Sequence, residues 1–497
     1  MHKKILAVIL VLLLAVSASA SEAESESEFV EGDVVVVLKS TSDSSLSAAA
    51  ADFAGFFGAA VKEYYPSLSE SSGQIFMTLH SDNMDALELS NALLKDSKVL
   101  AASPNYKVHA AVVPNDPRYG DCWGMSNINA PSAWNTSTGS GNVYVAIIDT
   151  GIDYSNPDLA ANVDTSLAHR TISGNSDNAF DDYGHGTHVA GTIGAVGNNG
   201  IGIAGVNWNV KMIPVKALDS SGNGTVASVM SAMNYVTDLI NSGVNIRAIN
   251  LSLETYINLA PNHDNLVQFP LWRAFKAVDD TNKAVIVVAA GNQGETVGQP
   301  STHANGSMIP GAGYYCYPAS FTGLYNMISV SAVERDSNTG ATQLASFSNK
   351  GANISAPGVN ILSTWLQNDT SSIGSDGVSL SSKQGTSMAV PHVAGAAALV
   401  SSAFPSATAY QIRQTLLIGS ALDVSASLSY ASSSLSLLSS KGTEWSAYDD
   451  YKLYEEQGER SSYSSDGGSS SGGCSGIQFG IAGAFVVIML ARKRMSW

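Results

Sequence analysis

Residues 143–153 read VYVAIIDTGID, an apolar run that ends in an acidic residue and a glycine turn. Because the apolar residues are continuous rather than alternating, the run predicts a strand that is buried on both faces. Strands of this kind belong to parallel sheets that helices cover on both sides. The stretch therefore predicts an α/β domain in which Asp149 ends a central strand, at the sheet edge where such domains carry functional groups.

The same succession of apolar strand, Gly-rich loop and helix continues toward the C-terminus. Further buried strands are predicted at residues 210–215, 248–253, 284–289 and 327–330, and helices at residues 185–195, 225–242, 271–281 and 387–403. This alternation predicts a three-layer α/β domain with a mainly parallel sheet, which we assign to residues 113–424.

A smaller α+β unit is predicted ahead of this domain, over residues 29–112. Its strands are expected at residues 34–38, 74–79 and 99–102, and its helices at residues 48–60 and 84–94. Asn, Asp and Pro at residues 115–117 break the pattern where the second unit begins.

The N-terminal end has the composition of an export signal. Residues 1–20 contain two lysines, then an apolar stretch, then small residues, which is the layout of a secretory signal peptide. An uncleaved membrane anchor is the alternative. The acidic Ser/Glu stretch at residues 21–28 predicts a flexible leader.

The C-terminal end changes character after the α/β domain. Residues 425–473 are rich in Ser and Gly and predict a linker. Residues 474–497 contain a short apolar span followed by Arg492-Lys493-Arg494, which predicts a membrane segment whose basic end stays on the inner side.

Charge and cysteine usage exclude two classes of function. The chain has 25 Lys and Arg against 42 Asp and Glu, a net charge of −17 without a basic patch, which argues against a nucleic-acid partner. The three cysteines Cys122, Cys316 and Cys474 lie too far apart in sequence for a metal cluster. Cys122 and Cys316 are expected either to form a disulfide or to stay as two buried free thiols.

Two motifs near the first strand supply an acid and a base. Asp149 ends its strand where a buried carboxylate can orient an imidazole. In GHGTHVAG, residues 184–191, His185 stands at a predicted helix start and can act as general base, whereas His188 is expected to have a core role. A zinc site of the metalloprotease type is excluded because the His pair lacks the accompanying Glu.

Two later motifs supply a nucleophile and an amide donor. QGTSMAVPHVAG, residues 384–395, places Ser387 at a helix start, where the helix dipole favours a nucleophile and a developing oxyanion. An ordinary helix-capping serine is the alternative, and His392 is expected to be packed. VVAAGN, residues 287–292, ends a strand with Asn292, whose amide is either an oxyanion donor or a turn residue.

Taken in the order Asp, His, Asn and Ser, these motifs resemble the subtilisin family of serine proteases over about residues 115–421. The resemblance implies that Ser387 is the nucleophile, His185 the base, Asp149 the orienting acid and Asn292 the oxyanion donor. It also implies that residues 29–112 are an inhibitory propeptide, with self-cleavage between Lys107 and Asp116.

The resemblance further implies substrate-binding segments and a calcium site. The strand that would pair with the substrate backbone is Ser252-Leu253-Glu254, and the opposite wall of the primary pocket would be Ala289-Ala290-Gly291. The implied calcium ligands are the side chains of Asp158, Asn199 and Asp116 and the carbonyl groups of Gly197, Ile201 and Ile203, an oxygen-only set that suits a hard cation. A Gly-rich hairpin without metal is the alternative for residues 197–203.

Three features depart from or extend the family pattern. The family usually has Gly where this chain has Glu254, which would alter the approach of substrate or favour basic side chains. The usual closing strand is not visible after Ala421. Ser469 to Ser475, with its Gly-Gly-Cys sequence and the apolar span that follows, resembles a bacterial C-terminal sorting signal.

The sequence as a whole predicts a secreted or envelope-anchored serine endopeptidase, made as a self-processing zymogen and acting on proteins or peptides through an acyl-enzyme. The alternative is a catalytically silent surface binding module that keeps the fold.

Overall fold

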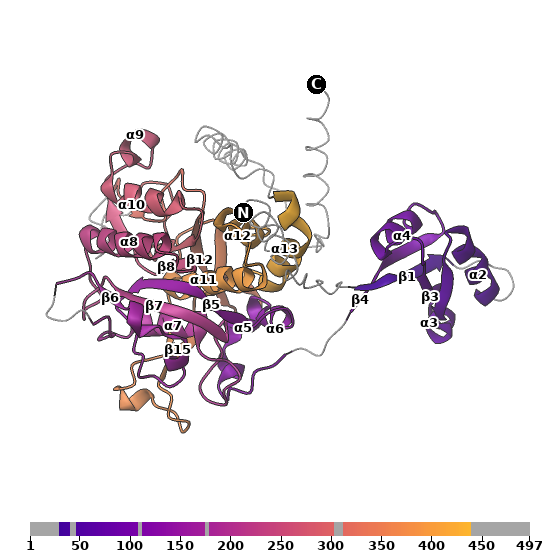
Figure 1. The fold of residues 1–497 in the computed structure, drawn as a ribbon, viewed down its shortest axis with the longest axis horizontal. Coiled ribbons are helices and arrows are strands. Elements are labelled where there is room, and N and C mark those ends of the chain that lie inside the picture. Colours follow the sequence, from indigo (N-terminus) through magenta and orange to yellow (C-terminus); the bar gives the residue numbers. More distant parts are fainter. Residues whose placement is uncertain (1–28, 40–45, 108–111, 174–177, 303–311, 439–497) are drawn as a thin grey trace, which may run out of the picture. The chain divides into compact units, whose positions relative to one another are not determined.

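The computed structural model describes residues 29–39, 46–107, 112–173, 178–302 and 312–438 (Figure 1). The chain divides into two compact units, Met1–Ala111 and Val112–Trp497. The expected signal peptide and leader, the end of the linker and the C-terminal sorting segment lie outside the described residues.

The N-terminal unit is a 4-stranded antiparallel sheet with strand order β2-β3-β1-β4 and helices between the strands (Figure 1). Its elements are β1 Phe29–Lys39, α2 Leu46–Phe56, β2 Ala60–Tyr64, α3 Pro66–Ser72, β3 Gln74–His80, α4 Ala86–Leu93 and β4 Val99–Tyr106. The core joins alternate residues of β1 and β3, such as Val34, Val36 and Met77, to Leu89 and Leu93 of α4. The unit is α+β, as the pattern predicted.

The sequence prediction missed β2 and α3 of this unit and placed the end of one helix wrongly. The helix expected at residues 48–60 ends at Phe56, and Ala60 already begins strand β2. Gly58 has a positive φ of 64°, a conformation that glycine adopts without the cost of a side chain, and it turns the chain out of the helix. The apolar composition of residues 48–60 concealed this break.

The C-terminal unit is organised around an 8-stranded sheet of order β13-β12-β10-β8-β5-β7-β6, with β14 also paired to β12. The strands are β5 Gly139–Asp149, β6 His169–Arg170, β7 Asn209–Lys216, β8 Ile246–Leu251, β10 Val285–Ala289, β12 Met327–Arg335, β13 Thr342–Leu344 and β14 Ile354–Pro357. Neighbouring strands are parallel except β13, which is antiparallel to β12. The mainly parallel sheet was correctly predicted.

Two hydrophobic clusters, one on each face of the sheet, give the unit its three layers. Val145 and Ile147 of β5 pack in the cluster that contains helices α7 His185–Gly194 and α11 Thr386–Ala403. Ala146 and Ile148 belong to the opposite cluster, with α8 Val226–Asn241 and α10 Pro270–Asp279. Since successive side chains of a strand point to opposite faces, the continuous apolar run fills both clusters.

Further short elements surround these layers. They are α5 Trp123–Asn127, α6 Ala130–Ala133, β9 Thr255–Ile257, α9 His263–Leu266, β11 Tyr315–Tyr317, β15 Ile361–Thr364, β16 Leu380–Lys383, α12 Ala409–Leu416, α13 Val424–Leu438 and the 3₁₀ turns η1 Tyr119–Asp121, η2 Ala160–Asn162, η3 Thr165–Leu167 and η4 Thr370–Ser372. Strands β9 and β11 pair with each other, as do β15 and β16.

The prediction of a linker from residue 425 was wrong at its start. Residues 424–438 form helix α13, and Val424, Leu428 and Ala431 are buried in the same cluster as α11 and α12. Apolar residues three or four positions apart face one side of a helix, so this short stripe is enough to pack it. The Ser content of the segment hid the stripe.

Two observations concern cysteines and membranes. Cys122 and Cys316 are both buried and both free, so they do not form the disulfide that was one of the two alternatives.

Within the described part of the chain, every helix is too short or too polar to cross a membrane.

Candidate active site

An aspartate and a histidine meet at the carboxyl end of the central strand. Asp149, the last residue of β5, is fully buried, and its Oδ1 lies 2.7 Å from His185 Nδ1. The same oxygen accepts the backbone N–H of Thr150 at 2.7 Å. Burial lowers the pKa of His185, but the charge and hydrogen bond of Asp149 raise it more, so the net shift is upward.

Helix α7 begins at His185 because its first turn is held on two sides. Gly184 precedes it with a φ of 103°, and a side chain there would lie 2.6 Å from the ring of Trp365. Asp181 accepts the N–H groups of Gly184 at 2.9 Å and Thr187 at 2.9 Å. The sequence analysis did not identify Asp181, although an aspartate just before a helix start is a capping signal.

Ser387 lies at the start of α11 and is tied to the end of β8. Its hydroxyl donates to the carbonyl oxygen of Ser252 at 3.2 Å, and the Ser252 hydroxyl donates back to the Ser387 carbonyl at 2.9 Å. Because a helix start presents N–H groups without acceptors inside the helix, this position is suited to negative charge.

The strand register brings the serine to the same sheet edge as the acid and base. Strands β5 and β8 are parallel neighbours in which Ile147 pairs with Asn250. Asp149 and Ser252 each follow two residues after that pair. The Asp149–His185 pair and the Ser252–Ser387 contact therefore lie at the carboxyl ends of adjacent strands.

Asn292 follows β10 and is oriented by the start of α11. Its side-chain oxygen accepts the backbone N–H of Thr386 at 2.8 Å and the Thr386 hydroxyl at 3.1 Å. The carbonyl end of the amide is therefore committed to the helix start, and the side chain also has a hydrogen bond with the Glu254 carboxylate. Thr386 was not predicted as a site residue, because a threonine before a serine is an unspecific signal.

These groups together can support nucleophilic catalysis. A histidine held by a buried carboxylate can accept a proton, a serine at a helix start can attack a carbonyl, and an amide NH₂ can stabilise an oxyanion. The other two histidines of the motifs have structural contacts, as expected. His188 Nε2 lies 2.9 Å from the Ile361 carbonyl and 3.0 Å from that of Ser381, and His392 Nδ1 lies 3.0 Å from that of Met388.

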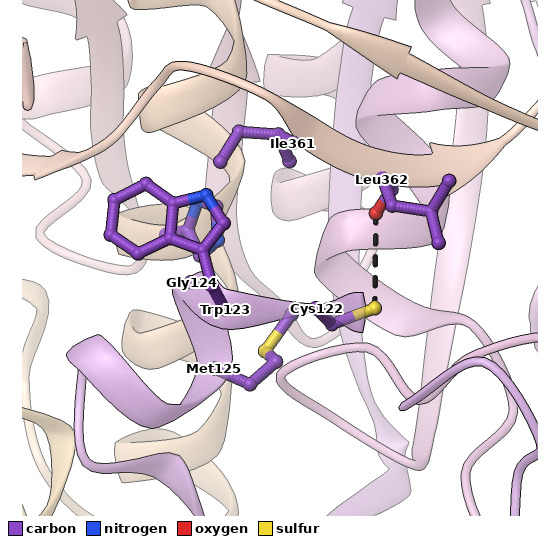
Figure 2. Close-up of a pocket in the computed structure, with 7 residues that line it drawn as sticks. Cys122, Trp123, Gly124, Met125, Ile361 and Leu362 are labelled. Carbon is purple, nitrogen blue, oxygen red and sulfur yellow. Dashed lines mark hydrogen bonds between the residues drawn. The ribbon is translucent and has the colours of Figure 1, made fainter. Parts of the chain in front are cut away.

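The surroundings of His392 confirm that it is packed. It lines a small pocket with the start of α5 and with Ile361 and Leu362 of β15. A side chain at Gly124 would come within 2.6 Å of His392 Nε2. In Figure 2 the thiol of Cys122 points to the Leu362 carbonyl, 4.0 Å away, and burial raises its pKa to about 12, which makes it an unreactive thiol.

The expected substrate-binding segments follow two neighbouring strands. Leu251 of β8 pairs with Val288 of β10. Glu254 and Gly291 each come three residues after their member of this pair, so the two segments leave the sheet at the same level. Ala289 and Ala290 are buried, whereas Leu253 and Glu254 are half-buried. The Glu254 carboxylate accepts the backbone N–H of Asn292 at 3.1 Å.

The expected calcium ligands gather at the loop 197–203. Asp158 is fully buried and accepts the Asn199 amide at 2.8 Å and the Ile203 N–H at 2.9 Å. Asp116 accepts the N–H groups of Asn198 at 2.6 Å and Asn199 at 3.3 Å. Gly197 and Ile201 belong to the same loop.

A third carboxylate was not predicted at this loop. Asp376 accepts the Gly202 N–H at 2.8 Å, and nothing in its Asp-Gly turn distinguishes it from other turns in the sequence. Burial raises the pKa of Asp158 to about 7, and the charges of Asp116 and Asp376 add to that rise. Each of the three acids thus contacts a different part of the loop 197–203.

The described residues contain no group of three or more His, Cys, Asp and Glu side chains close enough to hold a metal ion by themselves. A calcium ion here would therefore need amide and carbonyl oxygens as well as carboxylates, which is the kind of ligand set that calcium accepts. The donor chemistry of the loop fits that requirement.

Comparison with known proteins identifies the class of enzyme. Residues 140–452, more than half of the chain, match the model of the subtilase family, peptidase S8. A thermophilic serine proteinase of Bacillus sp. (strain AK1) is 33% identical over 378 residues, which are 75% of this chain and 79% of the relative. An extracellular protease of Xanthomonas campestris pv. campestris is 34% identical over 68% of this chain and 57% of its own length.

A solved structure agrees with these relatives. A protease from Pseudoalteromonas arctica superposes with a TM-score of 0.50 at 28% identity, over 64% of this chain and all of that structure. The α/β fold and these relatives define a hydrolase of the serine-protease class. The chain belongs to the subtilase family and is a subtilisin-like serine endopeptidase, which acts on proteins or peptides.

Proposed function

We propose that this chain is an exported endopeptidase, made as a self-processing zymogen, in which Asp149, His185, Ser387 and Asn292 carry the reaction. The observation that carries the proposal is the buried Asp149–His185 pair at 2.7 Å, at the same sheet edge as the serine that starts α11. That edge is where α/β enzymes hold their substrates.

In the proposed reaction, Ser387 Oγ attacks the carbonyl carbon of the peptide bond while its proton passes to His185 Nε2. The negative charge that develops on the carbonyl oxygen is stabilised by the Asn292 NH₂ group and the N–H of Ser387. Collapse of this intermediate breaks the C–N bond, and the leaving amine takes the proton from His185. Water then attacks the acyl-enzyme by the same route and releases the acid.

Asp149 has two functions in this scheme. Its Oδ1 holds the Nδ1 side of the His185 ring, which leaves Nε2 to exchange protons with the serine and the leaving group. Its negative charge stabilises the imidazolium that forms in the transition state, in keeping with the upward shift of the His185 pKa.

Substrate is proposed to lie between the segments Ser252-Leu253-Glu254 and Ala289-Ala290-Gly291. Both follow paired positions of the parallel strands β8 and β10, and both adjoin the contacts of Ser387 and Asn292. A peptide in extended conformation can add hydrogen bonds to such strand ends.

Calcium is proposed to bind at the loop 197–203, through Asp158, Asn199, Asp116 and the carbonyl groups of Gly197, Ile201 and Ile203. When bound, the ion would neutralise carboxylates and hold the loop, without taking part in the chemistry. The raised pKa of Asp158 supports the proposal, because it marks a carboxylate whose charge is opposed by burial and by two neighbouring acids.

Residues 29–112 are proposed to be the inhibitory propeptide, and the termini are proposed to direct export and sorting at the cell envelope. The α+β unit that ends before Val112 supports the first part. The extracellular protease among the relatives supports export.

The experiment expresses the full chain for export with calcium present, as wild type and as Ser387→Ala. Mass spectrometry follows release of the N-terminal unit, casein hydrolysis reports activity, and a fluorophosphonate probe labels a reactive serine. We expect only the wild type to process itself, digest casein and become labelled, with the label on Ser387. A folded wild type that does none of these things contradicts the proposal and favours a silent binding module.

A further inference from the structure

The turn that bears Asn292 has an acceptor for each of its backbone N–H groups. The N–H of Gly291 donates to the Thr386 hydroxyl at 3.3 Å, and that of Asn292 to Glu254 Oε2 at 3.1 Å. Further along, the N–H groups of residues 293 and 295 donate to Asn349 Oδ1 at 3.2 and 2.8 Å, and that of residue 294 to a backbone carbonyl at 2.8 Å. The turn is therefore anchored along its whole length.

Glu254 is the one acidic side chain among these acceptors, and it bonds to the residue that carries the oxyanion amide. Its carboxylate is mostly removed from water, and burial raises its pKa, while the Asn292 backbone and side chain and the Cys316 thiol act in the opposite direction. The Cys316 Sγ lies 3.9 Å from Glu254 Oε2.

The space behind the turn is filled by the same carboxylate. Gly291 has a φ of 107°, and a side chain there would lie 2.8 Å from Glu254 Oε2, 2.8 Å from Cys316 Sγ and 2.3 Å from Asn349 Nδ2. Tyr256 and Cys316 pair across β9 and β11, so this wall is part of a two-stranded sheet. The turn has no room to relax toward Glu254.

We propose that Glu254 is a positioning residue, which fixes the Asn292 amide by holding the Asn292 backbone N–H against the turn. This inference rests on the proposed role of Asn292 as oxyanion donor. It assigns to Glu254 a function other than attraction of basic substrate side chains, because its Oε2 is bonded to the Asn292 N–H within the protein. The turn otherwise relies on neutral acceptors.

The test is a double-mutant cycle on the full, self-processed enzyme, with Glu254→Ala, Asn292→Ala and the double variant. Two chromogenic peptides that differ only in an apolar or a basic residue before the scissile bond serve as substrates. Asn292→Ala should lower kcat by about 10²- to 10³-fold, the size known for loss of one oxyanion donor in a subtilisin. Glu254→Ala should lower kcat by about 10-fold on both peptides, with KM within about 2-fold.

The inference depends on whether the effects of the two substitutions on kcat are coupled. In the Asn292→Ala background, Glu254→Ala should cost less than about 2-fold, because a positioning residue has nothing left to position. Glu254→Gln, which keeps an acceptor for the N–H, should retain most of the activity. The inference is overturned if Glu254→Ala lowers kcat as much in the Asn292→Ala background as in the wild type. It is also overturned if Glu254→Ala changes KM alone, or if it changes the preference between the two peptides.

Two further outcomes keep the inference separate from the proposed function. If Asn292→Ala leaves kcat unchanged, the proposed role of Asn292 fails, and the inference fails with it. If Asn292→Ala behaves as expected but Glu254→Ala has no effect on kcat, only the inference fails. Should Glu254→Ala not be secreted, Glu254→Asp replaces it, because the shorter side chain withdraws the acceptor while keeping the charge, and the same cycle applies.

Discussion

Two aspartate–histidine pairs with the same short distance occur in the two units of this chain. Asp149 Oδ1 lies 2.7 Å from His185 Nδ1 in the C-terminal unit, and Asp33 Oδ1 lies 2.7 Å from His80 Nδ1 in the N-terminal unit. Both aspartate side chains are buried, at 0% and 1% exposure. The aspartate raises the pKa of the histidine in both pairs.

The difference lies in what surrounds each pair. Asp33 also accepts Lys62 Nζ at 2.6 Å and the Asn105 amide at 3.3 Å, and the second nitrogen of His80 lies 3.1 Å from Asp82. Both histidine nitrogens are thus occupied by acids. His185 uses Nδ1 in its contact with Asp149, at a sheet edge that also carries Ser387. A base needs a free nitrogen and a nucleophile beside it, and the pair distance alone does not supply either.

The largest expected effect is a loss of kcat when the charge of Asp149 is removed, with removal of the charge of Asp33 as the comparison. Asp149→Asn should lower kcat by about 10⁴-fold, the size known for this substitution in serine proteases, because the amide favours the wrong imidazole tautomer. Asp33→Asn should leave kcat of the processed enzyme unchanged, because residue 33 lies in the N-terminal unit that processing is proposed to remove. Active-site titration followed by steady-state kinetics on a peptide substrate measures both.

Thermal unfolding of both variants is the control for this prediction, since it separates lost catalysis from lost folding. An Asp149→Asn enzyme that folds and keeps more than about a tenth of wild-type kcat would contradict the role given to the Asp149–His185 pair.

The contrast between the pairs also shows how far the sequence could be interpreted. Asp149, His185, Asn292 and Ser387 were predicted because each ends a strand or begins a helix in a recognisable motif, and the parallel sheet follows from continuous apolar runs. Asp33 gave no such signal, because its partners Lys62 and His80 come from other strands. The roles of Asp181 and Thr386, and the bond from Asn292 to Glu254, depend on contacts across the fold that spacing cannot specify.

Boundaries were less predictable than elements, for a related reason. The helix that ends at Phe56 and the packed helix α13 were wrongly bounded, because composition outweighed one glycine in the first case and one apolar stripe in the second. Local sequence sets the type of an element, whereas packing against the rest of the unit decides where it ends.

The two units also differ in how their buried acids are neutralised. Asp33 has Lys62 as an internal cation, whereas Asp158 lies near Asp116 and Asp376 and is proposed to need calcium. Removing calcium with a chelator should destabilise the C-terminal unit by about 3 kcal/mol relative to calcium at 100 times its dissociation constant.

Calorimetry of the Ser387→Ala chain measures this effect, because that variant should not digest itself. The transition of the C-terminal unit should move to lower temperature, and that of the N-terminal unit should not. Equal stability with and without calcium would contradict the proposed site, and Asp158→Asn should reproduce the effect of the chelator.

A smaller effect is expected from breaking the Asp33 cluster. Asp33→Asn replaces the buried carboxylate that accepts from Lys62 and His80 by a neutral amide with a single acceptor oxygen, and loss of a buried charged partner costs about 1–3 kcal/mol. Hydrogen exchange in the Ser387→Ala chain should show lower protection in β1 and β3, whose residues the cluster joins. Unchanged protection there, with a normal C-terminal unit as internal control, would show that the cluster contributes nothing to stability.

The smallest expected effects are changes with pH. The protonation of His185 should affect activity, whereas that of His80 should affect stability. His185 must be neutral to accept a proton, and its pKa lies above the ordinary value of 6.5, so kcat/KM should rise with pH through a midpoint above 6.5. Asp149→Asn removes the charge that raises this pKa, and the midpoint of its residual activity should move to lower pH. A midpoint that stays in place would show that another group controls the acid limb.

His80 binds its proton more tightly in the folded unit, because hydrogen bonds to Asp33 and Asp82 raise its pKa above 6.5. The stability from this pair should therefore be complete below about pH 6.5 and lost as pH rises through the folded pKa. Since the side chain is 39% exposed, the change is expected to be small. Protection of β3 should fall as pH rises above about 6.5, and His80→Gln should remove this dependence without moving the activity midpoint. A pH dependence that persists in His80→Gln would assign it to another group.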